Sequence, residues 1–306
     1  MKFAFSTVSC PAWDFETIVA RAKEYGYDGV EVRGFLNESI LTAANPFLTD
    51  PAKIRGLFDA TGIEVCCLAS SIAMTRDRKG DARLADNLRT YIDTAQKLGC
   101  SMVKIFDTQV KAGSLLMPWR GQSRQTTATA LSEWLIPLAD YAADRGVVIV
   151  VENALSFRNA KEMWNIIDRL NHPSVGVCWD LFNAAVIGEV PAYSVPTLNS
   201  RILYTQVKDA KLGPLGATYC KIGEGDVKVR DFLRRLRGVG YEGYITVEWE
   251  KAWLPNLAEP EEILPHSIAK LREWDQRLEI SDWEAGAKPP EVKPPEQAVA
   301  ATPSPV

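Results

Sequence analysis

Residues 147–152 read Val-Val-Ile-Val-Val-Glu, and this stretch decides the predicted fold. Five consecutive β-branched residues are typical of a strand that is buried on both faces. The carboxylate of Glu152 does not belong in that apolar layer, because a buried charge needs a cation, a proton or water. The stretch therefore predicts a strand of a parallel sheet that carries a functional group at its carboxyl end.

The same pattern recurs in three later parts of the chain. The apolar stretches at 175–179, 202–205 and 244–247 lead directly into Asp180, Gln206 and Glu248. Four successive strands thus each end in a side chain with an oxygen donor. In a parallel barrel the carboxyl ends of the strands meet at one mouth, where active sites are built.

The remaining periodicity completes eight strand-then-helix units. Strands are predicted at 3–6, 30–33, 63–69, 102–106, 147–152, 175–180, 202–206 and 244–248. Helices are predicted after Asp14, and near 51–61, 81–98, 124–145, 159–170, 191–200, 228–237 and 259–278. Eight such units predict a single (β/α)₈ barrel over residues 1–280.

Three segments are predicted to lie outside this regular pattern. The long connection at 107–122 is a candidate lid, because long loops in compact domains are usually functional or mobile. A second long loop is predicted at 207–227. Residues 285–306 are rich in Pro, Ala and Glu, so we expect a disordered tail there.

Composition excludes several classes of protein. The net charge of the 306 residues is −4, and they contain no basic run, which argues against a nucleic-acid partner. No stretch has the length of a signal peptide or a membrane span. The six cysteines are scattered, which indicates reduced thiols and a cytoplasmic protein. A homo-oligomer is left open.

The four strand-end donors form a candidate metal site. Three carboxylates and an amide, from Glu152, Asp180, Gln206 and Glu248, make a hard-oxygen set that favours one Mn²⁺ or Mg²⁺ over Zn²⁺. The alternative is that each acid caps a neighbouring helix or pairs with a nearby lysine. Four donors on consecutive strands favour the metal site.

At this point the residues resemble a known family. The chain resembles the sugar phosphate isomerase/epimerase family. The resemblance rests on the segments at 26–33, 207–209, 223–226, 240–243 and 248–251, together with Glu152, Trp179-Asp180 and Asn183. That family has a xylose-isomerase-like barrel, and the resemblance covers about residues 1–275. It implies one divalent metal, held by a Glu, an Asp, a His and a Glu on strands five to eight. It also implies that Glu152 and Glu248 are the catalytic acid and base.

The chain departs from the family at strand seven, where Gln206 replaces the usual His. An amide oxygen is harder and usually a weaker donor than imidazole, so we expect a looser site for Mn²⁺ or Mg²⁺. Complete loss of the metal is the alternative.

The resemblance implies proton transfer next to a carbonyl through a metal-stabilised enediolate. The expected enzyme is a metal-dependent isomerase or epimerase of a small ketose or keto-polyol. Expected substrate-binding residues are Arg33, Lys104, Lys208 and Lys221, which could grip hydroxyls or an anionic group. Each of them could instead pair with an acid, for example Arg33 with Glu31.

Other functions remain in competition. A lyase, either a dehydratase or a decarboxylase, could act on a keto-sugar or keto-sugar acid. A non-catalytic sugar-binding barrel could have lost turnover with the strand-seven His. A DNA-repair endonuclease on the same barrel needs a His-rich three-zinc site, and the two histidines of this acidic chain argue against it.

Overall fold

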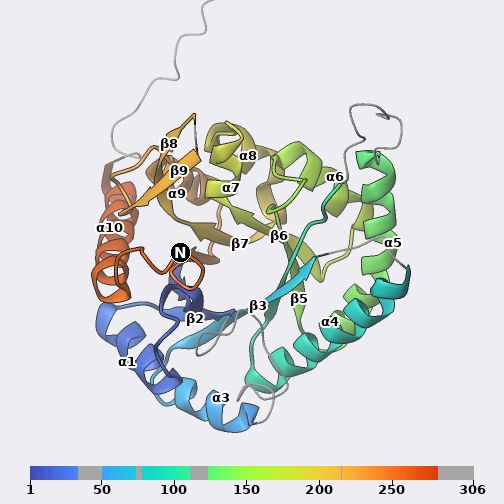
Figure 1. Ribbon diagram of the computed structural model, residues 1–306, viewed down its shortest axis with the longest axis horizontal. Helices are drawn as coiled ribbons and strands as arrows, with labels where there is room; N and C mark the ends of the chain where they lie inside the picture. Colours follow the sequence, from blue (N-terminus) through green and yellow to red (C-terminus); the bar gives the residue numbers. More distant parts are fainter. Residues whose placement is uncertain (34–49, 74–77, 111–122, 215, 282–306) are drawn as a thin grey trace, which may run out of the picture.

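The computed structural model describes residues 1–33, 50–73, 78–110, 123–214 and 216–281. Eight parallel strands close into a barrel in the order β1-β10-β7-β6-β5-β4-β3-β2 (Figure 1). The strands are β1 (Lys2–Ser6), β2 (Gly29–Val32), β3 (Glu64–Ala73), β4 (Met102–Phe106), β5 (Val148–Glu152), β6 (Val175–Asp180), β7 (Ile202–Val207) and β10 (Tyr244–Val247). The predicted (β/α)₈ barrel is confirmed.

Helices surround the barrel and cover the outer face of its strands (Figure 1). They are α1 (Phe15–Tyr25), α3 (Pro51–Asp59), α4 (Arg78–Leu98), α5 (Arg124–Ala143), α6 (Ala160–Leu170), α7 (Leu181–Val186), α8 (Pro191–Leu198), α9 (Val229–Gly238) and α10 (Pro260–Ser281). None of the helices in these ranges combines the length and apolarity needed to span a bilayer.

Local signals explain where the first helix begins and ends. The Asp14 carboxylate accepts the Thr17 amide at 2.8 Å, which satisfies one of the free N–H groups of the first turn. Gly26 ends α1 with φ +85°, a conformation that glycine adopts without strain. Ile18, Val19 and Ala22 then face the barrel, where full burial stabilises a large apolar side chain by about 1.5–3 kcal/mol.

The alternation of each strand separates the barrel into two packed regions. Outward-facing side chains such as Ile149 and Val151 join the layer between strands and helices. Inward-facing side chains fill the barrel, and a buried cluster inside it contains Ala4, Cys66, Cys67, Val150, Cys178, Tyr204 and Tyr244. Two residues further along β5, β6 and β7, the inward positions reach the mouth at Glu152, Asp180 and Gln206.

The sequence-based prediction missed a hairpin and a short helix. The segment predicted as a loop at 207–227 contains an antiparallel hairpin of β8 (Asp209–Gly213) and β9 (Gly216–Cys220). The short helix α7 follows β6 directly, because Asp180 caps it by accepting the Asn183 amide at 2.8 Å. Most of the candidate lid, at 111–122, and the tail at 285–306 lie outside the described residues.

Candidate active site at the barrel mouth

Strand register brings the four predicted donors to the same mouth. Glu152 ends β5 and Asp180 ends β6, while Glu248 follows β10 directly. Gln206 pairs with Asp180 across one strand boundary and with Thr246 across the other. All four donors are buried, with at most 3 % of each residue exposed. They therefore lie together in one buried region.

Lys208 lies among these acids. Its ammonium Nζ is 2.9 Å from Asp180 Oδ2 and 2.7 Å from Glu248 Oε2. It also lies 2.9 Å from Oε1 of the half-buried Glu250. One ammonium thus joins carboxylates from two expected metal ligands and from a third acid. The other oxygen of Asp180, Oδ1, accepts a hydrogen bond from the Asn183 backbone amide, so Asp180 also caps α7.

Lys104 and Arg33 add two further buried cations. Lys104 Nζ lies 2.6 Å from Glu152 Oε2, 3.6 Å from Glu248 Oε1 and 3.8 Å from Glu31 Oε2. Arg33 Nη1 donates to Glu248 Oε1 at 2.6 Å. The guanidinium of Arg33 therefore pairs with Glu248, and not with Glu31 as the alternative interpretation had it. Glu248 is the acid on which all three cations converge.

Gln206 presents its amide nitrogen to the acids. Nε2 donates to both oxygens of Glu31 at 3.1 Å and to Glu248 Oε1 at 3.0 Å. Its Oε1 lies 3.6 Å from the Cys178 thiol, which donates to it. In this arrangement Gln206 links two carboxylates as a hydrogen-bond donor.

Burial raises the pKa values of three of the buried acids, against the opposing charge of nearby lysines. Burial raises the pKa of Glu152 and of Glu31, and the ammonium of Lys104 opposes that rise. Burial likewise raises the pKa of Asp180 against the opposing charge of Lys208. These three carboxyls therefore take up a proton more readily than an exposed acid does.

The pKa of Glu248 shifts in the opposite direction. Burial favours its protonated form, but Lys208, Lys104 and Arg33 together outweigh burial and hold the pKa of Glu248 well below its usual range. Two buried glutamates at one mouth thus differ in their affinity for a proton. Such a difference is typical of an acid and base pair.

The donor set suits a hard divalent cation in chemistry and in charge. Five carboxylates contact three cationic side chains, so the ionised cluster carries two uncompensated negative charges. Oxygen donors from carboxylates and an amide are those that Mn²⁺ or Mg²⁺ prefers. As the side chains stand, no group of three His, Cys, Asp or Glu within the described ranges is spaced for a metal. Lys208 occupies the space between Asp180 and Glu248 instead.

One predicted residue does not join the cluster. Lys221 pairs with Glu262 of α10 at 2.8 Å, and its side chain is one-third exposed. Two residues that the sequence analysis did not single out do join it. Glu250 contacts Lys208, and the Tyr219 hydroxyl donates to Glu250 Oε2 at 2.9 Å. The available signal was the position of Glu250 only two residues after Glu248, which follows β10 directly.

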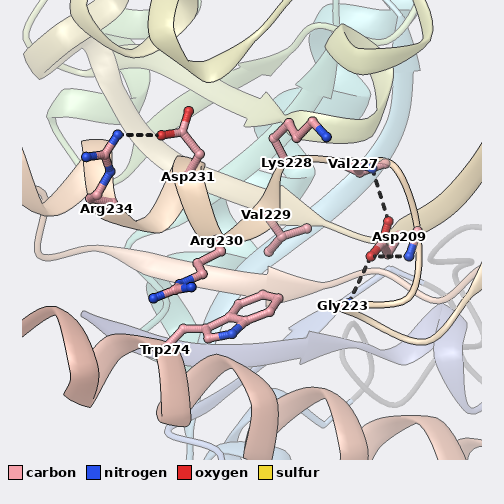
Figure 2. A pocket seen from close by; sticks show the side chains of 10 residues that line it. Asp209, Gly223, Val227, Lys228, Val229, Arg230, Asp231, Arg234 and Trp274 are labelled. Atoms are coloured by element: carbon pink, nitrogen blue, oxygen red, sulfur yellow. Dashed lines mark hydrogen bonds and ion pairs between the residues drawn. The ribbon is translucent and has the colours of Figure 1, made fainter. Parts of the chain in front are cut away.

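Asp209 organises the loop behind the mouth. Its buried carboxylate accepts the backbone amides of Gly223 at 2.9 Å, Gly225 at 3.0 Å and Val227 at 3.2 Å (Figure 2). A cavity of about 540 Å³ adjoins this loop and is lined by Asp209, the first turn of α9 and Trp274. Among the described residues that line it, none is a predicted site residue.

Gly225→Ala should destabilise the protein by about 1–3 kcal/mol, because overpacking a filled site costs that much. A Cβ at Gly225 would overlap the Asp209 carboxylate and lie 2.6 Å from the Ala210 carbonyl oxygen. The free energy of unfolding in urea is the measurement. Gly238→Ala is the matched control, since a Cβ there meets no atom within 4 Å. Equal stability of the two variants would contradict the role given to Asp209.

Comparisons with known proteins agree with this architecture. The family model for the xylose isomerase-like TIM barrel matches residues 19–274. The chain is 25% identical over 264 residues to 3-dehydroshikimate dehydratase from Pseudomonas putida. That match covers 81% of this chain but only 38% of the dehydratase, so the chain spans about two fifths of that protein's length.

Solved structures share the same barrel at low identity. The IOLI protein with a binding zinc atom has a TM-score of 0.73 and 17% identity, over 91% of this chain and 99% of that one. D-allulose 3-epimerase from Methylomonas sp. has a TM-score of 0.70 and 18% identity, over 89% of this chain and 96% of that one. With the family model matching most of the sequence, the chain belongs to the family of xylose isomerase-like TIM barrels.

Proposed function

We propose that this protein is an isomerase or epimerase that moves a proton next to the carbonyl of a small ketose or keto-polyol. The observation that carries the proposal is the relation between Glu152 and Glu248. They come from non-adjacent strands, yet both approach the Lys104 ammonium, at 2.6 and 3.6 Å. Their pKa values are also shifted in opposite directions. Membership of an enzyme-rich barrel family supports the proposal.

The two glutamates take different roles. Glu248 stays ionised beside its three cations, so its carboxylate is unprotonated when the substrate binds, and in this proposal it accepts the proton from the substrate carbon as the substrate takes over contacts with those cations. Glu152 has the raised pKa of an acid that can hold and return a proton. Lys104 lies between them and stabilises negative charge as it develops on the substrate oxygen. Proton return to the opposite face gives an epimer, and return to the neighbouring carbon gives an isomer.

Glu152, Asp180, Gln206 and Glu248 would hold one Mn²⁺ or Mg²⁺ in this proposal. Bound there, the cation would supply Lewis acidity toward the carbonyl and so acidify the neighbouring C–H bond. The zinc of the IOLI protein and the uncompensated charge of the cluster support a divalent cation. A cytoplasmic setting and a small-molecule sugar partner belong to the same proposal.

Dehydration is the second candidate, and the similarity to 3-dehydroshikimate dehydratase favours it. The first step is the same, because Glu248 removes a proton next to a carbonyl. The pathways separate when a hydroxyl on the next carbon leaves as water. Glu152 would then donate its proton to that hydroxyl, so the same acid and base serve both reactions.

Incubation in D₂O tests the proposal. We expect D-fructose, D-allulose or a related ketose to gain one deuterium at the carbon next to the carbonyl, with the sugar retained as an isomer or epimer. Mass spectrometry and proton NMR measure this directly. Loss of one water from 3-dehydroshikimate under the same conditions would favour the dehydratase. If none of these compounds exchanges a proton even after Mn²⁺ is added, a non-catalytic barrel becomes the better interpretation.

A further inference from the structure

From the structure we infer that the apolar pocket beside the mouth binds an aromatic substituent of the substrate, so that the preferred compounds are aryl-substituted sugars or polyols. The inference rests on the proposed function, because it places the reacting end of the same molecule at the acid cluster. The pocket has a volume of about 420 Å³. Its lining consists of Phe182, Ala217, Thr218, Tyr219, Leu254, Pro255, Asn256 and Leu257.

The lining suits a neutral ring. Phe182 and Tyr219 are tilted against each other with ring centroids 5.2 Å apart, and two leucines and a proline complete the apolar walls. The lining residues carry no charge, and Thr218, Asn256 and the Tyr219 hydroxyl are the polar groups among them. Pockets of about 300–1,000 Å³ with mostly apolar walls and a few polar groups are typical of small-molecule sites.

The pocket is connected to the reactive cluster by direct contacts. Tyr219 donates its hydroxyl to Glu250 at 2.9 Å, and Glu250 pairs with Lys208 at 2.9 Å. The ring of Phe182 lies 5.3 Å from Lys208 Nζ, and Phe182 belongs to α7, which begins directly after Asp180. Lys208 thus lies next to both the acid cluster and the wall of the pocket. A substrate with its carbonyl at the cluster has this pocket next to it.

The hairpin explains why the pocket exists. β9 contributes Ala217, Thr218 and Tyr219, and its partner β8 contacts α7. Burial raises the pKa of the Tyr219 phenol, so its hydroxyl stays neutral and fixes the ring by donating to Glu250. Leu254, which also lines the pocket, leaves 44 % of its surface exposed. An aromatic ring that enters the pocket would cover this exposed apolar surface.

Calorimetric titration with 6-O-phenyl-D-fructose and 6-O-methyl-D-fructose, two ketoses that differ only in this substituent, tests the inference through binding. The wild-type protein should bind the phenyl compound at least about tenfold more tightly, since apolar pockets discriminate ring-sized groups by that factor or more. Ala217→Trp fills the pocket from an exposed position, and Leu254→Ser removes an apolar wall. Both should abolish the preference. Ile187→Ser, equally exposed at 46 % but absent from the lining, is the matched control and should keep it.

The other outcomes distinguish failure of this inference from failure of the proposed function. Equal binding of the two ketoses by the wild type, including binding of neither, would overturn the inference, as would a preference that survives Ala217→Trp. If Leu254→Ser turns a dimer into a monomer in sedimentation and no phenyl preference exists, the apolar surface is an interface between copies of the chain. A phenyl preference without any deuterium exchange would instead refute the proposed function and leave the pocket assigned.

Discussion

Glu248→Gln should lower the rate of deuterium exchange into the substrate by about 10²–10⁴-fold, the usual contribution of a positioned general base. The carboxamide cannot accept a proton from carbon. It also presents an NH₂ group to Arg33, Lys208 and Gln206, which all donate to Glu248 in the native arrangement. Single-turnover exchange in D₂O, followed by mass spectrometry, measures the change.

Glu152→Gln should lose turnover as well, by removing the acid that returns the proton. Glu31→Gln is the matched control, because Glu31 is as buried and also lies near Lys104, at 3.8 Å, but has no proton-transfer role in the proposal. Circular dichroism is the check that all three variants are folded. Normal exchange in either Glu152→Gln or Glu248→Gln, or an equal loss in Glu31→Gln, would refute the acid and base assignment.

The barrel and the position of its mouth could be predicted because each depends on local pattern. A β-branched run that ends in an acid identifies a buried strand and its carboxyl end together, as in Val148–Glu152. Eight strand-then-helix units predict that the sheet closes into a barrel. Alternation then fixes which side chains enter the barrel, so Gln206 and Lys208 had to lie on the same side as Tyr204.

The pairing of charges could not be predicted, because it depends on long side chains that meet across the barrel. Lys104 on β4 reaches Glu248 beyond β10, and these strands are not neighbours. Sequence patterns describe neighbours along a strand or a helix and contain no information on such reach. The hairpin at 209–220 was missed for a related reason. Its outer half is exposed, so it lacks the apolar alternation that identifies buried strands.

Lys208→Met should reveal whether the acids accept a divalent cation. The substitution removes the Lys208 ammonium, which lies 2.9 Å from Asp180 and 2.7 Å from Glu248. Breaking such a buried ion pair costs about 3–5 kcal/mol. The free energy of unfolding of the metal-free variant should fall by that amount. The methionine also frees the oxygens that Lys208 occupies. Added Mn²⁺ should therefore raise the melting temperature of Lys208→Met more than that of the wild type.

In the wild type, the ammonium of Lys208 and the divalent metal compete for the same carboxylate oxygens. A metal that binds only the folded protein stabilises it by about 2.7 kcal/mol at a hundred times its dissociation constant, so the rescue is large enough to measure. Lys221→Met is the control, since its pair with Glu262 lies at the solvent-exposed surface, where ion pairs contribute little to stability, and should not respond to Mn²⁺. Equal shifts in the wild type and in Lys208→Met would mean that Lys208 does not compete with the metal. If neither protein responds, the acids are held by lysines and arginine alone, and the non-catalytic barrel becomes the better interpretation.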